Sequence, residues 1–295
     1  MNRIKLAAFV VIALITGAAA HSAGPTAPAE LLYSYDRYLP LHAEEKAVME
    51  TDDYTLAHIT FRGDHERKVT ALLAIPKKGA PPYPAVMLLH GINASKDGIF
   101  AEYGAGIAKA GYAVYAMDGE YHGEREIDVS KEIMRYPYTF GDMFVQTIRD
   151  LRRSADYLEG RGEIDAARMG YVGYSLGSFE GTVFAALEKR VKAVALVVGG
   201  SMKQTFGPLA LSKEFRQMLP AMDPEVFVKK ISPRPLLMVN AEDDILIPPG
   251  NAKILFDAAA EPKTHVFVKS GHVIPADILL EHLLPWLDEN LKPSD

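Results

Sequence analysis

From residue 85 to the end of the chain, short apolar segments alternate with segments of helical periodicity, and this alternation constrains the fold most. Ala85–Leu89 contains no polar residue, which is typical of a strand buried on both faces of a parallel sheet. Glu102–Ala110 then fits a helix that ends at Gly111. Because strands and helices that alternate along a chain form parallel sheets covered by helices, the sequence predicts an α/β fold.

The same patterns predict the remaining elements. The expected strands are Tyr54–Phe61, Val69–Ile75, Tyr112–Met117, Arg168–Val172, Val191–Val198, Pro235–Asn240 and His265–Val268. The expected helices are Phe140–Leu158, Leu176–Leu187, Gly250–Ala260 and Ala276–Leu291. Thr139-x-x-Asp142 fits a capping box that would begin the first of these helices.

The first twenty residues have the pattern of an export signal. A basic start precedes fifteen uncharged residues, Leu6–Ala20, a length that falls short of the ~30 Å hydrocarbon core of a membrane. Ala18-x-Ala20 fits a signal-peptidase site, with cleavage after Ala20 and with Ser22 or Ala23 as other cleavage positions. An uncleaved anchor is the alternative. The sequence thus predicts an exported protein, periplasmic or secreted, with no stable membrane span after cleavage.

Beyond this signal, the sequence predicts a flexible tail over residues 21–30 and one domain over residues 31–295. Residues 199–234 fit either a small lid or a helix that packs on the sheet. The formal net charge of −6 argues against a nucleic-acid partner, which needs a concentrated basic patch. The chain has no cysteine, so disulfides, a thiolate metal site and a cysteine nucleophile are excluded.

The segment Gly173-Tyr174-Ser175-Leu176-Gly177 places a serine in a G-x-S-x-G pattern between a predicted strand and a predicted helix. This strand–turn–helix context is the structural condition for a nucleophile elbow, which raises the serine hydroxyl above the sheet. The turn is too tight for side chains at its two flanking positions, which explains both glycines. We therefore expect Ser175 to be a nucleophile.

A serine hydroxyl needs a base that takes its proton, and a carboxylate that orients the base. With an elbow of this kind the acid and then the histidine follow the serine along the chain. Of the three histidines after Ser175, His265 begins an apolar strand and His282 lies within a helix, whereas His272 lies in the loop after the last strand. We expect His272 to be the base.

The acid should follow the preceding strand, where Glu242, Asp243 and Asp244 compete. Asp244 stands four residues before Pro248, and this offset favours it. Asp243 and Glu242 remain the alternatives.

The negative charge that develops on the acyl oxygen needs two backbone N–H donors. Leu176, directly after the nucleophile, is expected to supply one. Ile92, in the loop after Ala85–Leu89, is expected to supply the other. His90 lies in the same loop but precedes the serine, so we expect it to order the loop and not to act as the base.

These motifs resemble those of the α/β-hydrolase superfamily, and within it the dienelactone-hydrolase-like and prolyl-oligopeptidase-like esterases. The matching pieces are His90-Gly91, Asp118–Glu124, the Ser175 elbow, Ile231–Pro235, Asp244–Pro248 and Gly271-His272. The resemblance implies an eight-stranded, mostly parallel sheet, a Ser-Asp-His triad and no cofactor. Dienelactone hydrolases proper use a cysteine nucleophile, which this chain lacks.

Two further groups of residues lie near the expected site. His122 stands between carboxylates, but no second histidine lies at ligand spacing, so no metal is expected. The aromatic side chains of Tyr136, Tyr138 and Phe206 fit a substrate pocket or ordinary core packing equally well.

The sequence therefore predicts an exported serine hydrolase that cleaves small-molecule carboxylic esters through an acyl-enzyme. A peptidase or acyltransferase of the same fold, and a non-catalytic binding protein on a hydrolase scaffold, are the alternatives. The natural ester, its acyl chain length and the oligomeric state follow from no motif.

Overall fold

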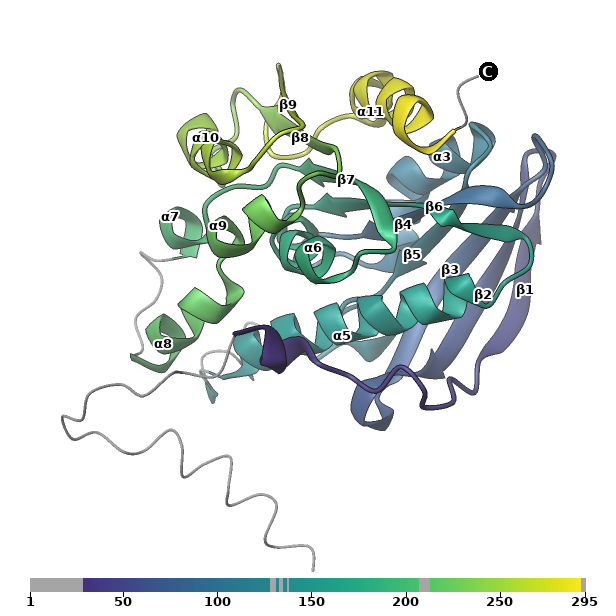
Figure 1. Ribbon diagram of the computed structural model, residues 1–295, viewed down its shortest axis with the longest axis horizontal. Helices are drawn as coiled ribbons and strands as arrows, with labels where there is room; N and C mark the ends of the chain where they lie inside the picture. Colours follow the sequence, from purple (N-terminus) through teal and green to yellow (C-terminus); the bar gives the residue numbers. More distant parts are fainter. Residues whose placement is uncertain (1–28, 128–130, 133–134, 137, 207–212, 293–295) are drawn as a thin grey trace, which may run out of the picture.

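The computed structural model describes residues 29–127, 131–132, 135–136, 138–206 and 213–292, and nine strands within them form one mixed sheet (Figure 1). The strands are β1 (Glu44–Glu50), β2 (Tyr54–Arg62), β3 (Lys68–Pro76), β4 (Tyr83–Leu89), β5 (Ala113–Met117), β6 (Ile164–Tyr174), β7 (Val191–Val197), β8 (Leu236–Ala241) and β9 (Lys263–Val268). Their order is β1-β2-β3-β5-β4-β6-β7-β8-β9. The six strands from β5 to β9 in this order pair in parallel, and the other three pair antiparallel. The predicted α/β fold with a mostly parallel sheet is confirmed.

The expected number of eight strands is wrong by one edge strand. β1 pairs antiparallel with β2, and each of its residues is exposed. Glu44–Glu50 therefore has no buried face, and the alternation of apolar and polar residues that marks a half-buried strand is missing from its sequence.

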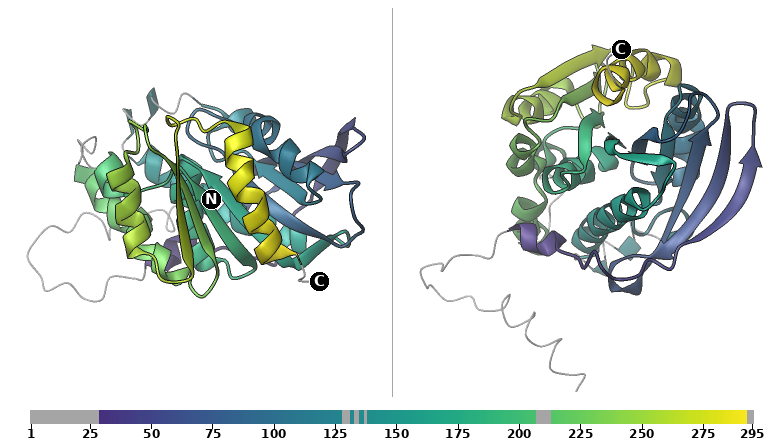
Figure 2. Two further views of the ribbon diagram at one scale, coloured as in Figure 1. Left: turned by 90° about the horizontal axis from the view of Figure 1, so that it is seen from above. Right: turned by 45° about the vertical axis from the view of Figure 1, so that its right-hand side comes forward.

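Helices cover both faces of the sheet (Figures 1 and 2). They are α2 (Lys96–Ile99), α3 (Ala105–Lys109), α5 (Thr139–Glu159), α6 (Leu176–Leu187), α7 (Met202–Phe206), α8 (Lys213–Met222), α9 (Pro224–Phe227), α10 (Pro249–Ala258) and α11 (Ala276–Leu291), with short helical turns η1 (Ala29–Tyr33), η2 (Asp64–Glu66), η3 (Phe100–Gly104), η4 (Gly123–Arg125) and η6 (Val228–Lys230). Met87 and Leu89 of β4 belong to the core layer under α5 and α6. Val86 and Leu88 belong to the layer under α3 and α11. Because successive side chains of a strand point to opposite faces, β4 is buried on both sides, as its apolar sequence indicates.

Helix α5 begins at Thr139, one residue before the expected start at Phe140, and without the expected cap. Tyr138 precedes the helix, and no side chain caps its first turn. The Asp142 carboxylate instead accepts hydrogen bonds from Arg67 and from the hydroxyl of Tyr121. The predicted capping box is wrong because groups from other parts of the chain occupy this carboxylate.

The segment 199–234, expected as a lid or a packed helix, contains α7, α8, α9 and η6; residues 207–212 lie outside the described part. Met202 and Met222 are buried in the core. Met218 packs so closely on α5 that a Cβ at Gly141 would lie 2.6 Å from its sulfur. The described part of this segment therefore packs on α5 and α6.

The predicted export signal and residues 21–28 of the predicted tail lie outside the described residues. Ala29 and Glu30, which the sequence places in the tail, belong to η1, and Glu30 forms an ion pair with Lys230. No helix in the described part of the chain is long and apolar enough to cross a membrane.

Residues 29–43 form an N-terminal strap that runs along α5 (purple in Figure 1). Tyr33 is fully buried, and its hydroxyl donates a hydrogen bond of 2.8 Å to the carbonyl oxygen of Ala221. Arginines of α5 hold the strap through its backbone carbonyls: Arg152 binds Tyr33 O at 3.0 Å and Arg153 binds Arg37 O at 2.9 Å. The strap thus joins α5 to the end of α8.

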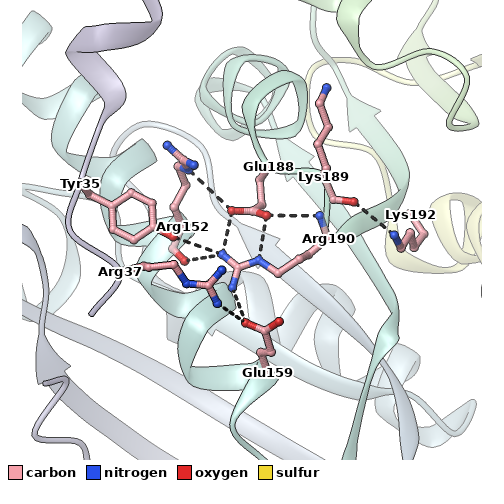
Figure 3. A pocket seen from close by; sticks show the side chains of 8 residues that line it. All are labelled: Tyr35, Arg37, Arg152, Glu159, Glu188, Lys189, Arg190 and Lys192. Carbon is pink, nitrogen blue, oxygen red and sulfur yellow. Dashed lines mark hydrogen bonds and ion pairs between the residues drawn. The ribbon is translucent and has the colours of Figure 1, made fainter. Parts of the chain in front are cut away.

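An ion-pair network lies between the strap and the amino end of β7. Its side chains line an open cavity of about 410 Å³ (Figure 3). The guanidinium of Arg190 lies at its centre and donates to Glu188 at 2.8 Å, Asp156 at 2.7 Å and Glu159 at 2.9 Å. Burial by itself raises the pKa of Glu188, but the hydrogen bonds from Arg190 outweigh this and hold the pKa below its usual range. Arg190 therefore keeps the buried Glu188 carboxylate ionised.

We expect Arg190→Met to lower the free energy of unfolding by about 2 kcal/mol. The substitution removes the nearest cation of Glu188 and leaves only the more distant Arg152, at 3.6 Å, beside this carboxylate, whereas Asp156 keeps its ion pair with Arg153. Urea unfolding at neutral pH measures the change. The matched control is Lys192→Met, which removes an exposed cation of the same cavity and should change the free energy by less than about 0.5 kcal/mol. Equal effects of the two substitutions would contradict a structural role of the network.

Candidate active site

The candidate site lies at the point in the sheet where the order of successive strands changes direction. β4 is placed between β5 and β6, and in open α/β sheets ligands bind beyond the carboxyl ends of the strands at such a point. Leu89 at the end of β4 pairs with Gly173 near the end of β6. The loop that begins at His90 and the turn that carries Ser175 are therefore neighbours.

Ser175 lies in a tight turn in which neighbouring segments of backbone approach one another closely. Its φ of 52° and ψ of −111° lie in a region that residues with a side chain rarely adopt. A Cβ at Gly173 would lie 2.2 Å from the carbonyl oxygen of Gly177, and a Cβ at Gly177 would lie 2.4 Å from that of Leu89. Both flanking positions therefore require glycine, as the G-x-S-x-G pattern indicates.

The structure brings Ser175, His272 and Asp244 together, although 97 residues separate the first two. Ser175 Oγ lies 3.0 Å from His272 Nε2, and His272 Nδ1 lies 2.8 Å from Asp244 Oδ2. In the tautomer that carries its proton on Nδ1, the imidazole donates to the Asp244 carboxylate, and Nε2 is left to accept from the serine hydroxyl.

Of the three consecutive carboxylates, Asp244 is the one that contacts His272. It is 3% exposed, whereas Glu242 and Asp243 are exposed to solvent. The second oxygen of Asp244 accepts hydrogen bonds from the backbone N–H groups of Leu246 at 2.8 Å and Ile247 at 2.9 Å. These bonds fix the carboxylate toward the imidazole.

The two backbone groups expected to bind an oxyanion lie next to Ser175. Leu176 is the first residue of α6, where an N–H group has no partner within the helix. A Cβ at Gly91 would lie 3.1 Å from Ser175 Cβ, so the loop that contains Ile92 touches the serine. Within the described part of the chain, neither the Leu176 nor the Ile92 N–H donates to a protein acceptor. Both are therefore available to a ligand.

His90 is held within this loop by both ring nitrogens. Its Nδ1 lies 2.7 Å from Gly91 O, and its Nε2 accepts a hydrogen bond of 3.0 Å from Gly119 N. Burial lowers the pKa of His90 to about 4, so the ring is neutral near pH 7. The geometry thus ties the loop after β4 to the loop after β5.

Two tyrosines that no sequence motif marks hold the loop of His272. The Tyr174 hydroxyl donates to His272 O at 2.7 Å and accepts from Ile274 N at 3.0 Å. The Tyr103 hydroxyl donates to Ile274 O at 2.8 Å. No local motif marks these contacts, because each joins residues about 100 or more positions apart.

The three aromatic residues proposed to line a pocket lie in different surroundings. Tyr136 and Tyr138 are 52% and 50% exposed, so neither packs in the core. Phe206 is half-buried, and its ring lies 5.5 Å from the rings of both Phe140 and Phe179. Phe206 thus covers the first turns of α6 beyond Ser175.

Buried ionic groups support the loop after β5. Lys96, 1% exposed, places its ammonium 3.1 Å from Asp118 and 2.8 Å from Glu124. His122 lies in the same loop, and its Nδ1 is 2.9 Å from Glu120 O. Among the residues that the structure describes, no group of three histidine, aspartate or glutamate side chains is arranged for a metal ion.

Comparisons with known proteins agree with this architecture. A family model described as the alpha/beta hydrolase fold matches residues 84–227. YtaP of Bacillus subtilis (strain 168), a protein named as a hydrolase, is 25% identical over 169 residues, which are 52% of this chain and 56% of YtaP. This chain therefore matches little more than half the length of that relative.

Two solved structures are similar over most of this chain. An acetyl xylan esterase from Paenibacillus sp. R4 superposes with a TM-score of 0.68 and 18% identity, over 89% of this chain and 92% of that one. A cold-adapted esterase from an Arctic intertidal metagenomic library has a TM-score of 0.65 and 19% identity, over 86% of this chain and all of that one. At these identities the likeness establishes a shared fold.

One carboxyl group near the site should make stability depend on pH. Glu180 lies on α6, five residues after Ser175, and is 2% exposed. Burial raises its pKa well above the usual range, whereas in the unfolded chain the pKa is ~4.3. Unfolding above that pH releases a proton, so the contribution of Glu180 to stability falls as the pH rises, by up to about 1.4 kcal/mol per unit.

We therefore expect Glu180→Gln to gain stability relative to the wild type as the pH is raised from 4.5 to 8, because the amide carries no proton to lose. Urea unfolding at both values measures the difference. The exposed Glu242, changed to Gln, serves as the control and should show no such gain. A difference that is the same at both pH values would contradict a protonated Glu180.

Proposed function

We propose that this protein, which has the α/β-hydrolase fold, is a serine esterase that cleaves small-molecule carboxylic esters through an acyl-enzyme. The observation that carries the proposal is the hydrogen-bonded chain from Ser175 through His272 to Asp244, with contacts of 3.0 Å and 2.8 Å. The names of the two structural neighbours, both esterases, support the same reaction class.

In the first half of the proposed reaction, Ser175 Oγ attacks the ester carbonyl while His272 Nε2 takes its proton. Asp244 stabilises the imidazolium that forms, and it holds the ring in the orientation that faces the serine. The N–H groups of Leu176 and Ile92 bind the negative oxygen of the tetrahedral intermediate. His272 then returns the proton to the leaving alcohol, and the acyl group stays on Ser175.

In the second half, water takes the place of the alcohol. His272 Nε2 removes a proton from the water molecule, which attacks the acyl carbon. The same two N–H groups bind the second oxyanion. Collapse of this intermediate returns the proton to Ser175 Oγ and releases the carboxylic acid.

We expect the wild-type protein to hydrolyse p-nitrophenyl esters between acetate and decanoate, and Ser175→Ala to lose at least ~10⁴-fold in kcat. Release of p-nitrophenol measures both, and circular dichroism shows that the variant is folded. Ser34→Ala, which changes an exposed serine of the strap, is the control and should keep full activity.

Turnover retained by Ser175→Ala would exclude Ser175 as the nucleophile. A wild-type protein that neither cleaves these esters nor reacts with a fluorophosphonate would exclude the esterase.

Asp244→Asn should lower kcat by ~10³–10⁴-fold, because an amide at this position favours the wrong imidazole tautomer. The neighbouring variant Asp243→Asn should stay within about threefold of the wild type, since Asp243 is exposed and does not contact His272. The two variants are compared on the ester that the wild type cleaves fastest. The opposite ranking would assign the acid to Asp243.

A further inference from the structure

We propose that Tyr174 is a positioning residue that sets the place of His272 relative to Ser175. The inference rests on the proposed function and extends it to a residue that does not touch the substrate. Tyr174 is the last residue of β6 and directly precedes Ser175. The same short piece of backbone therefore carries the nucleophile and the group that holds the base.

The hydroxyl of Tyr174 binds the His272 loop on both sides of one exposed residue. It donates to His272 O at 2.7 Å and accepts from Ile274 N at 3.0 Å. Val273 lies between these two points and is 71% exposed. One hydroxyl group thus holds the backbone of the loop at two residues, His272 and Ile274.

Few other bonds hold this loop. The pairing of β9 with the sheet ends at Val268, and the next tie is the hydrogen bond from Asp243 N to Ser270 O. Within the described part of the chain, the backbone of residues 271–274 is hydrogen-bonded to distant residues through Tyr174 and Tyr103 alone. Within the loop, the Ser270 hydroxyl lies 3.1 Å from Gly271 O and 2.9 Å from Val273 O, but these bonds do not join the loop to the rest of the molecule. The position of His272 relative to the sheet therefore depends on the two tyrosine hydroxyl groups and on its own bonds to Ser175 and Asp244.

The ring of Tyr174 is itself fixed. It stacks on Tyr103 with ring centres 5.4 Å apart and planes 19° from parallel, and it meets the His272 ring edge-on at 6.3 Å. These ring contacts survive a change to phenylalanine, whereas both hydrogen bonds of the hydroxyl are lost. Tyr174→Phe therefore removes the hydrogen bonds to the loop and keeps the packing of the ring.

A direct tie matters because β6 and β9 are not neighbours. β7 and β8 lie between them, and at about 4.8 Å between adjacent strands the two strand ends are roughly 14 Å apart. A misplacement of about 1 Å between reacting groups is enough to cost ~10²-fold in rate. The His272 loop returns from β9 toward β6, and the Tyr174 hydroxyl binds its backbone there. The position of His272 relative to Ser175 therefore does not depend on the two intervening strands alone.

The test compares the wild-type protein with Tyr174→Phe in two assays. The first measures kcat and KM for the best p-nitrophenyl ester, and the second measures the rate at which a fluorophosphonate labels Ser175. We expect kcat and the labelling rate to fall about 10- to 100-fold, and KM to change less than about threefold, because no group that binds substrate is altered.

Two matched variants separate positioning from stability. Tyr115→Phe removes a buried hydroxyl that is bonded to Ser154 at 3.0 Å, away from the His272 loop, and should leave kcat within about twofold of the wild type even if it lowers the thermal midpoint. Tyr103→Phe removes one of the bonds to Ile274 and should lower kcat by a smaller factor than Tyr174→Phe. If Tyr174→Phe does not fold, the comparison of Tyr103→Phe with Tyr115→Phe decides the question in the same way.

Tyr174→Phe with the wild-type kcat and labelling rate would overturn the inference while the proposed function stands. A fall in kcat of Tyr115→Phe as large as that of Tyr174→Phe would overturn it as well, since loss of any buried hydroxyl would then suffice. A wild-type protein that the fluorophosphonate does not label would instead refute the proposed function, and the role of Tyr174 with it.

Discussion

The candidate site depends on one constraint, the close approach of three pieces of backbone around Ser175. Gly173 faces the carbonyl oxygen of Gly177, and Gly177 in turn faces that of Leu89. A residue held at positive φ in such a turn costs of order 1–3 kcal/mol. Hydrogen bonds from Ser175 N to Val197 O and from Gly177 N to His90 O oppose this strain. The half-buried Ser175 is thus held in a strained conformation by the central strands of the sheet.

Behind this turn lies a layer of buried polar groups that connects the loops at the carboxyl edge. His90 joins the loops after β4 and β5 through Gly119, and the Asp118 carboxylate accepts from Lys96 N at 2.8 Å and from the Thr70 hydroxyl at 2.8 Å. Buried charges stabilise a protein weakly but are costly to unpair. We interpret the layer as a rigid support for the loop of Ile92, whose N–H we propose as an oxyanion donor.

Sequence patterns predicted those features that are local along the chain. The fold class follows from the apolar strands, and Ser175 follows from a pentapeptide between a strand and a helix. His272 follows from its place after the last strand. The offset from Pro248 favoured Asp244 over Asp243 and Glu242 but left both as alternatives, because the sequence does not show which side chain turns inward; in the structure Asp244 contacts His272. β1 has no buried face to detect, and Tyr174 meets the His272 loop across about 100 residues of sequence, where no pattern of spacing exists.

The N-terminal strap makes contacts of very large sequence separation, and this has a consequence for the order of folding. Tyr33 meets Ala221 across 188 positions, and Glu30 meets Lys230 across 200. Contacts that close such long loops form late, because the chain must first lose the entropy of closing them. The strap can dock only after α5 and the α8–α9 segment have reached the sheet. It therefore completes the fold, and local opening of the native protein should begin by its release.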